Sequence, residues 1–425
     1  MKAEVTPETA VPGPGEAATT PPSSDRERER ARIREGVWYC LKVFLALRLG
    51  LFLLALIGVA ILPHDILPVS VPGWRAPGFT PGWHNLFTAW ERQDALWFLR
   101  IATHGYRLHD GSAAFFPLYP MAIRAVSFVL GNHPLAGAIV VSNAAFLGGL
   151  VVLYFLTSSE LSEDAARKTV LYLAVFPTSF FFLAPYSESL FLLLTVTSFW
   201  AARRGKWPLA GVAGALAALT RNLGLLLLPA LALEALHQWR GRRADAGPSG
   251  ARDRGRALAW SLLWSGFVGV GTAAYLAYWQ WFAGDWLRPV TNQGLWQRAS
   301  SLPWNTLGQA TRDAYEYVGA YAGGYHELDW VIVVPALLVA GYALARFRPA
   351  YGFYAWASIL VPLCFPFSGR PLLSVPRFLV VLFPIFWGLA VLAERKWVPH
   401  HLIVAVGAAG LGLFTVLFVN WLYIF

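Results

Sequence analysis

Apolar runs long enough to cross a lipid bilayer recur from residue 37 to the C-terminus, and they restrict the chain to few folds. A membrane-spanning helix needs roughly 20 mostly apolar residues. The runs lie at about 37–62, 135–157, 169–185, 188–202, 207–220, 222–237, 257–283, 330–347, 351–368, 376–393 and 400–423. The alternating pattern of a membrane β-barrel is absent. The sequence therefore predicts an all-α polytopic membrane protein with about 11 transmembrane helices.

Composition agrees with this class and argues against a nucleic-acid partner. Charged residues make up only 14% of the chain, whereas a soluble protein carries roughly a quarter. The net charge of +10 lies mainly in loops between apolar runs, as expected when positive loops stay in the cytoplasm and contact membrane lipids. Cys40 and Cys364 lie in or beside apolar runs and have neither a disulfide pattern nor metal-ligand spacing.

A cytoplasmic N-terminus gives a self-consistent topology in which the lysines fall on the inner side. It requires that residues 113–130 do not cross, so we interpret them as a half-helix or interfacial helix broken by Pro117 and Pro120. Two outer loops result, at 63–134 and 284–329. Residues 1–36 are expected to form a disordered cytoplasmic tail, residues 37–425 a single domain, and residues 238–256 a cytoplasmic linker.

The stretch from Trp90 to Pro120 contains Asp94, the main candidate acid of the first outer loop. The part of this stretch before Gly105 is predicted to form a helix with two distinct faces, one apolar and one polar. The first carries Asp94, Trp97, Phe98 and Ile101, and the second carries Arg100, Thr103, His104 and Arg107. This pattern is typical of a helix in the membrane–water interface. Such a helix can hold Asp94 at the height of a lipid head group.

A second acid, Glu188, follows a break at Pro185. It is expected in the first turn of a new helix, where the helix dipole favours a carboxylate. A capped turn explains the neighbouring Ser187 and Ser189 well. An acid at membrane depth is costly, however, so Glu188 is expected to be functional or paired.

Four arginines lie at membrane depth or at the outer ends of spans. Arg221 stands with Asn222 at a break between two short apolar runs. It either forms an anion site, or it snorkels or pairs with Glu188; we favour the anion site. Arg377 is the better phosphate ligand because its guanidinium fork lies at the start of a buried span. Arg370 is assigned to nonspecific lipid head groups, and Arg48 to pairing or snorkelling.

Nucleotide-binding, zinc-protease, serine-hydrolase and redox motifs are absent. The sequence predicts no cofactor and no metal ligands, and it leaves a dependence on divalent ions open. The acceptor and the oligomeric state also stay open.

WERQDALWFLRIATHGY…AAFFPLYP, followed by FFLAPYSESLF, ALTRNLG and SVPRF, resembles the PIG-V mannosyltransferase family. That family lies in the GT-C superfamily of enzymes that use polyprenyl-phosphate sugars. The resemblance covers the chain from about residue 37 onward, and it implies a GT-C-type bundle with interfacial helices in the first extracytoplasmic loop. Asp94 matches the acid of the family's Trp-Asp-Ala motif, although Gln93 replaces the usual Trp. The acid that usually follows Gly-Tyr is displaced to Asp110.

The resemblance implies transfer of mannose from a polyprenyl-phosphate-mannose donor to a lipid-linked or glycan acceptor at the extracytoplasmic face. Asp94 would act as general base in an inverting single displacement, with Arg221 and Arg377 binding the donor phosphate. The expected substrate-binding residues are Tyr186, Glu188, His104, Tyr106 and Asn222. One rival interpretation is a transporter or flippase of lipid-linked sugars, which would also have broken helices. A weaker one is an inactive scaffold in a transferase complex.

Overall fold

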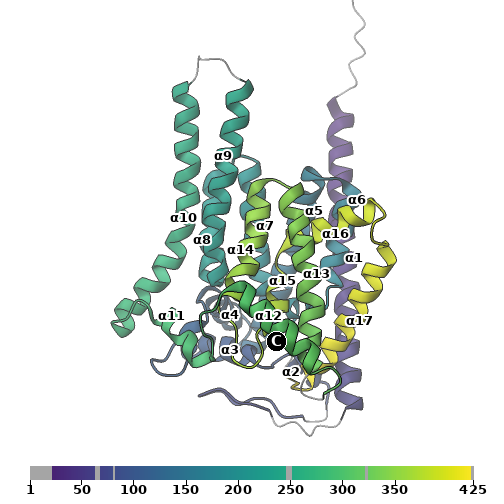
Figure 1. Cartoon of the computed structure of the whole chain (residues 1–425), viewed down its shortest axis with the longest axis vertical. Coiled ribbons are helices and arrows are strands. Elements are labelled where there is room, and N and C mark those ends of the chain that lie inside the picture. Colours follow the sequence, from purple (N-terminus) through teal and green to yellow (C-terminus); the bar gives the residue numbers. More distant parts are fainter. Residues whose placement is uncertain (1–21, 63–67, 80–81, 246–250, 321–323, 423–425) are drawn as a thin grey trace, which may run out of the picture.

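The computed structural model describes residues 22–62, 68–79, 82–245, 251–320 and 324–422, and the helices and turns there form one bundle (Figure 1). The longer helices are α1 (Pro22–Ile61), α5 (Pro134–Glu160), α6 (Glu163–Ala174), α7 (Glu188–Arg203), α8 (Trp207–Thr220), α9 (Leu227–Asp245), α10 (Ala251–Ala283), α13 (Gly324–Arg346), α14 (Pro349–Leu363), α16 (Phe383–Glu394) and α17 (His400–Val419). The N-terminal end of α1 lies at the top of the view, and its C-terminal end lies at the bottom.

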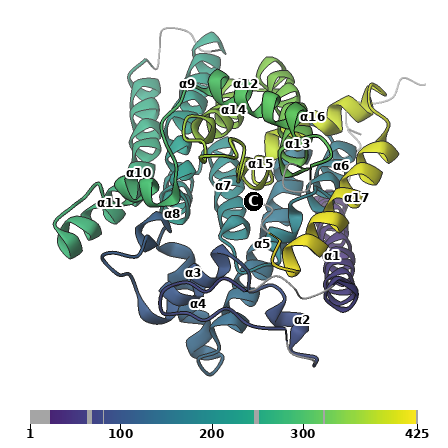
Figure 2. The same ribbon diagram turned by 60° about the horizontal axis from the view of Figure 1, so that its bottom comes forward.

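Shorter elements gather toward the lower end of the bundle, opposite the N-terminus of α1 (Figures 1 and 2). The segment 63–134, expected to be the first outer loop, contributes α2 (Asn85–Thr88), α3 (Asp94–His104), η1 (Ser112–Ala114) and α4 (Leu118–Val129). Later segments contribute η2 (Ser179–Phe182), η3 (Asn222–Leu226), α11 (Arg288–Thr291), η4 (Asn292–Trp296), α12 (Pro303–Glu316) and α15 (Val375–Leu379).

Among the described residues, five helices are long and apolar enough to cross a membrane: Arg26–Ile61, Pro134–Glu160, Arg252–Ala283, Tyr325–Arg346 and His400–Val419. The chain is thus an all-helical, multi-pass membrane protein, but the expected count of about 11 continuous spans is not reproduced. The runs 169–185 and 376–393 are each interrupted, the first after Ala174 and the second after Leu379. Pro177 and Pro384 lie at these interruptions, and proline has no N–H with which to continue a helix.

The segment predicted to lie outside the membrane at 113–130 does form a short helix, α4, with Pro117 as its N-cap residue. Its 12 residues extend only about 18 Å, well short of the roughly 30 Å hydrocarbon core. Pro120 does not break this helix because it lies in the first turn, where its missing N–H costs little.

The expected tail and linker are more helical than predicted. Residues 1–21 lie outside the described residues, but 22–36 belong to α1. Arg32 of this extension pairs with Glu163 at 2.7 Å, and Glu35 pairs with Arg167. These contacts to α6 favour a helix over a disordered tail. Most of the linker 238–256 is likewise helical, in α9 and α10, and residues 246–250 are outside the described part.

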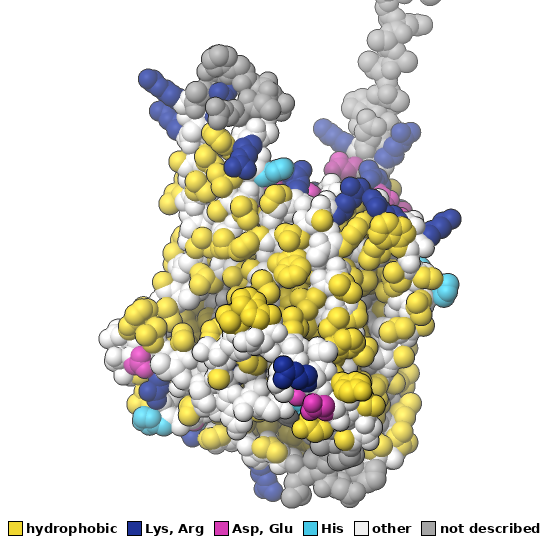
Figure 3. All heavy atoms as spheres, viewed as in Figure 1, with side chains coloured by type: hydrophobic (Ala, Val, Ile, Leu, Met, Phe, Trp, Pro, Cys, Tyr) yellow, Lys and Arg dark blue, Asp and Glu magenta, His cyan; other side chains and the backbone are white. Residues whose placement is uncertain are grey.

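Apolar side chains cover the middle of the molecule, and many Lys and Arg side chains gather at the top of the view (Figure 3). This separation follows the pattern expected of loops at one membrane face. Which face is cytoplasmic stays a prediction.

Four helices in the half of the bundle away from α3 are joined by partly buried ion pairs. Arg203 at the end of α7 contacts Glu160 of α5 at 2.5 Å and Glu234 of α9 at 2.8 Å. Arg348, the N-cap residue of α14, approaches Glu160 to 3.3 Å. These pairs connect four helices without any contribution from Asp94 or Arg377, so Arg203 provides a matched control for the arginines described next.

Candidate active site

Asp94 is the first residue of α3. Gln93 before it adopts φ 52° and ψ −119°, which turns the chain sharply into the helix. An acidic side chain at the N-terminal end of a helix interacts favourably with the helix dipole, and Asp94 occupies that position in α3. The predicted helix is confirmed, as is its end at Gly105, which has φ 75°.

Arg377 on α15 contacts Asp94 across 283 residues of sequence, with Nη1 donating to Oδ2 at 2.6 Å. The short helix α15 follows Ser374, which has φ 71°, and begins with Pro376 in its first turn. The Arg377 side chain is 11% exposed and that of Asp94 is 26% exposed. The carboxylate is therefore the more accessible end of this pair.

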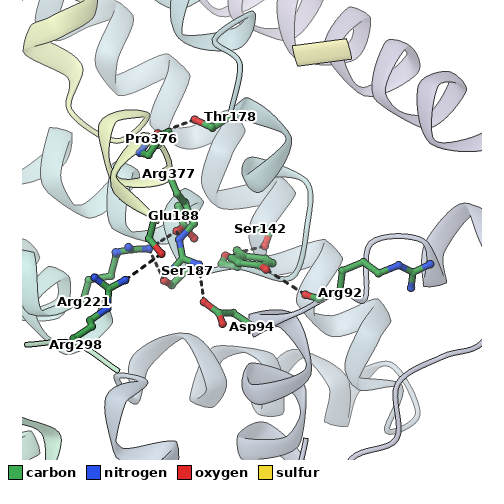
Figure 4. A network of polar contacts seen from close by, with 12 residues as sticks. Arg92, Asp94, Ser142, Thr178, Ser187, Glu188, Arg221, Arg298, Pro376 and Arg377 are labelled. Carbon is green, nitrogen blue, oxygen red and sulfur yellow. Dashed lines mark hydrogen bonds and ion pairs between the residues drawn. The ribbon is translucent and has the colours of Figure 1, made fainter. Parts of the chain in front are cut away.

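Glu188 connects Arg377 to a second arginine (Figure 4). It is the first residue of α7, and its side chain is fully buried. Its Oε1 lies 3.0 Å from Nε of Arg377 and also accepts a hydrogen bond from Nη1 of Arg221. Arg221 adopts an extended conformation between α8 and η3, which confirms the helix break predicted there. We call Asp94, Arg377, Glu188 and Arg221 the charged cluster.

Arg221 thus makes the pairing that the sequence offered as the alternative to a free anion site. Its Nη1 also donates to Oγ of Ser187 at 3.2 Å. Glu188 contacts both guanidinium groups, which provide the opposite charge that a buried carboxylate needs. An arginine fork has five N–H donors, so these contacts use only part of its capacity.

Aromatic rings surround the charged cluster. The guanidinium carbon of Arg377 lies 5.3 Å from the centroid of the Tyr186 ring and 5.6 Å from that of Phe181. Arg221 lies 5.0 Å from the centroid of Phe378. Rings at these distances attract the cations and exclude water, which strengthens charge interactions.

Three of the predicted substrate-binding residues make their contacts elsewhere. His104 is exposed at the end of α3, with its ring 6.0 Å from that of Trp74. Tyr106 donates to the carbonyl of Phe115 at 2.7 Å. Asn222 is exposed, and its Oδ1 accepts a hydrogen bond from the backbone N–H of Leu223 at 2.9 Å within the first turn of η3. Only Tyr186 and Glu188 of that set contact the charged cluster.

Two further arginines have partners that differ from the expected ones. Arg370, assigned to nonspecific lipid head groups, is buried and makes two bonds to Asp329, at 2.7 and 2.8 Å. Arg100, placed on the polar face of an interfacial helix, is fully buried and pairs with Asp110. The displaced acid Asp110 is thus engaged in holding the loop after α3. Arg48 is paired as predicted, with Asn143 and the carbonyl of Phe182.

Sequence reasoning did not single out Arg298, which contacts the residue before α15 from the segment 284–329. Its Nη2 donates to Oγ of Ser374 at 3.2 Å, and its Nη1 donates to the carbonyl of Phe365 at 2.9 Å. Nothing in the local sequence signals these contacts, because the partners lie 76 and 67 positions away.

Glu91, three positions before Asp94, was also missed. Its Oε1 accepts a hydrogen bond from the Trp74 indole at 2.7 Å, and burial raises the pKa of its carboxyl group. Within the described residues, no group of three or more His, Cys, Asp and Glu side chains is placed to hold a metal ion.

Residues 39–242 match the family model for Mannosyltransferase (PIG-V), and this match confirms the resemblance noted in the sequence. Mouse GPI alpha-1,6-mannosyltransferase 2 is 34% identical over 152 residues, which cover 32% of this chain and 30% of the relative. The human protein of the same name is 29% identical over 171 residues, which cover 37% and 34%. The chain thus spans about a third of the length of these relatives.

Two solved structures align with most of this chain, but their TM-scores and sequence identities are low. ArnT from Cupriavidus metallidurans bound to undecaprenyl phosphate has a TM-score of 0.45 and 16% identity, over 90% of this chain and 76% of that one. The oligosaccharyltransferase AglB from Archaeoglobus fulgidus has a TM-score of 0.42 and 10% identity, over 91% and 56%.

Proposed function

We propose, from the match of residues 39–242 to the PIG-V mannosyltransferase family, that this protein is a membrane glycosyltransferase of the GT-C type. It transfers mannose from a polyprenyl-phosphate-mannose donor to a lipid-linked or glycan acceptor. The observation that supports this most is the charged cluster, where a partly accessible carboxylate contacts one of two buried arginines that share a second carboxylate.

The geometry supports a single-displacement mechanism. Asp94 accepts the proton of the acceptor hydroxyl as that oxygen attacks the anomeric carbon. The bond from that carbon to the phosphate oxygen breaks, and the lipid phosphate leaves with the electron pair. Arg377 and Arg221 stabilise the charge that develops on it. A single displacement inverts the anomeric centre.

The contact between Asp94 and Arg377 has a role before the donor binds. A guanidinium at 2.6 Å holds the carboxylate in position through a charge-assisted hydrogen bond. A donor phosphate that pairs with Arg377 loosens this contact and leaves Asp94 available to the acceptor. Glu188, which is buried and touches both arginines, keeps the two guanidinium groups in place during this exchange.

The active site faces away from the cytoplasm in this proposal. α3 and α15 lie toward the bottom of Figure 1, whereas the N-terminal end of α1 lies at the top, and Figure 2 brings that lower end forward. With a cytoplasmic N-terminus, the charged cluster is then extracytoplasmic.

A largely apolar cavity of about 330 Å³ beside α3 suits the donor's isoprenoid tail. Its lining comes from α3, α4, α8 and α10, including Ile101, Leu219 and Ala274. Ile101 lies seven positions after Asp94 on α3, which is about 10 Å along the helix. A tail in this cavity therefore has its phosphate end within reach of the charged cluster.

Filling the cavity is expected to discriminate between donors by chain length. Ala274→Trp places an indole in the cavity, so it should raise KM for a long polyprenyl donor by about 10-fold or more, the loss expected when apolar contacts are displaced. KM for a donor with a single isoprene unit should change little. Ala273→Trp is the matched control, because Ala273 is also exposed on α10 but does not line the cavity. Equal effects of both substitutions on both donors would contradict this placement.

The direct test of the function is incubation of the purified protein in detergent with polyprenyl-phosphate mannose, radiolabelled in the sugar, and a total glycolipid extract as acceptor. We expect a new labelled glycoside with inverted anomeric configuration. A transporter of lipid-linked sugars would leave the label on its original phosphate. An inactive scaffold would give the same negative result, and either outcome would overturn the proposal.

A further inference from the structure

The C-terminal end of α17 contacts the turn that precedes Asp94. Arg92 is 2% exposed, and its Nε donates to the carbonyl of Val419 at 3.0 Å. Its Nη1 donates to the carbonyls of Thr88 at 2.7 Å and Glu91 at 3.1 Å. A single buried guanidinium thus ties three backbone carbonyls together, one from α17 and two from the turn before α3. Hydrogen bonds from a charged guanidinium are stronger than those between neutral groups.

Gln93 and Trp421 add two contacts between the same segments. The side-chain amide of Gln93 donates to the carbonyl of Leu422 at 3.1 Å. The ring of Trp421 is buried, with its centroid 4.7 Å from the guanidinium carbon of Arg92. Trp421 also packs in a small apolar cluster with Leu96 of α3. We call Val419–Leu422 the C-terminal clip.

The clip is itself held in place. Trp421 adopts φ 65°, and Nδ2 of Asn420 donates to the carbonyl of Gly58 in α1 at 3.0 Å. α17 packs along α1, and both helices are long and apolar enough to span a membrane. The clip therefore connects the rigid bundle to the start of α3.

The turn that the clip contacts sets the position of Asp94. Gln93 has φ 52°, a left-handed conformation that glutamine rarely adopts and that its surroundings must maintain. The carbonyl of Arg92 accepts from the backbone N–H of Ala95 at 3.0 Å and from the Tyr186 hydroxyl at 3.2 Å. Tyr186 also lies against Arg377. Release of the clip would allow Gln93 to relax and would shift Asp94 relative to Arg377.

We propose that the C-terminal clip positions the Asp94 carboxylate for catalysis, with Arg92, Gln93 and Trp421 as positioning residues. The expected effect of the clip on turnover rests on the proposed function, whereas its role in holding Asp94 in position does not. The clip touches neither Arg221 nor Arg377 in the contacts described above, so its effect should fall on turnover and spare donor binding. Gln93, where the related family usually has Trp, is in this protein the side chain that reaches the clip.

The test compares Trp421→Ala with Trp397→Ala, whose side chain is 65% exposed before α17. We expect Trp421→Ala to lower kcat by about 10- to 100-fold, the loss expected for a catalytic group displaced by about an ångström, and to leave KM for polyprenyl-phosphate mannose unchanged. Trp421→Phe keeps an aromatic face against Arg92 and should restore most of kcat. Trp397→Ala should resemble the wild type. A loss of protein yield with normal kcat in the folded fraction would indicate a merely structural role and overturn the proposal.

Hydrogen exchange supplies a readout that does not depend on activity. Backbone amides of Ala95 and Leu96, which bond to the carbonyls of Arg92 and Gln93, should exchange faster in Trp421→Ala, while those in α5 and α16 stay unchanged. Gln93→Ala, which removes only the bond to Leu422, serves if Trp421→Ala does not fold. Unchanged exchange at α3 in a folded variant would overturn the proposal. If the wild type transfers no mannose, the proposed function fails, and the exchange data still decide whether the clip holds Asp94.

Discussion

Asp94→Asn is expected to lower kcat by about 100- to 10,000-fold, the contribution of a positioned general base. The amide has nearly the shape of the carboxylate and can still accept a hydrogen bond from Arg377, but it cannot take a proton from the acceptor hydroxyl. Asp94 is 26% exposed, so the stability of the fold should change little. The measurement is the rate of mannose transfer by purified protein, with the thermal unfolding midpoint as a check on folding.

Asp110→Asn is the matched control for this substitution. Asp110 is a second acid of the same loop, and it is 8% exposed and paired with the fully buried Arg100. Loss of its charge should lower the unfolding midpoint, because Arg100 is then left without its partner. The kcat of the folded fraction should be retained. Wild-type turnover by Asp94→Asn, or an equal loss of turnover in both variants, would contradict the assignment of Asp94 as the base.

Arg377→Gln is expected to weaken donor binding and the fold together. A charged hydrogen bond contributes about 1.5–3 kcal/mol, so KM for the donor should rise by about 10- to 150-fold. The substitution also leaves Glu188 buried with Arg221 as its remaining described partner in the charged cluster. Breaking a buried pair costs about 3–5 kcal/mol of unfolding free energy. Transfer kinetics and denaturant unfolding measure the two effects separately.

The control for Arg377→Gln is Arg203→Gln in the ion-pair group remote from Asp94. Arg203 also bridges two carboxylates, Glu160 and Glu234. We expect a comparable loss of stability and no change in donor KM. If Arg377→Gln is destabilised but keeps the wild-type KM, then Arg377 is only a structural partner of Asp94 and Glu188.

Sequence periodicity and breaks predicted the local structure around these residues well. The helix from Asp94 to Gly105 and the interruption at Arg221 are both present, because each depends on residues close in the chain. The start of α7 at Glu188 also follows from a nearby proline, Pro185. The predicted number of continuous spans is not confirmed among the described residues, because hydropathy alone does not show where Pro177 and Pro384 interrupt a run.

Contacts between residues far apart in the chain could not be predicted from the sequence. Nothing near Arg370 in the sequence identifies Asp329 as its partner. Arg100 was predicted to lie on the polar face of an interfacial helix, but the loop after α3 brings Asp110 into contact with it. Asp94 and Arg377 were each singled out from their local surroundings. Their direct contact depends on α15 packing against the start of α3, which a single sequence does not reveal. The roles expected of His104, Tyr106 and Asn222 stay predictions. Their contacts in this structure lie outside the charged cluster, because closeness in the sequence does not imply contact in space.

A structure of the protein with a polyprenyl phosphate bound would test the proposed mechanism most directly. We expect a phosphate within hydrogen-bonding distance of both Arg221 and Arg377 and an isoprenoid tail in the cavity lined by Leu219 and Ala274. The Asp94 carboxylate should lie on the side from which an acceptor hydroxyl would approach. A phosphate bound away from both arginines, with Asp94 and Glu188 keeping their present partners, would contradict the mechanism.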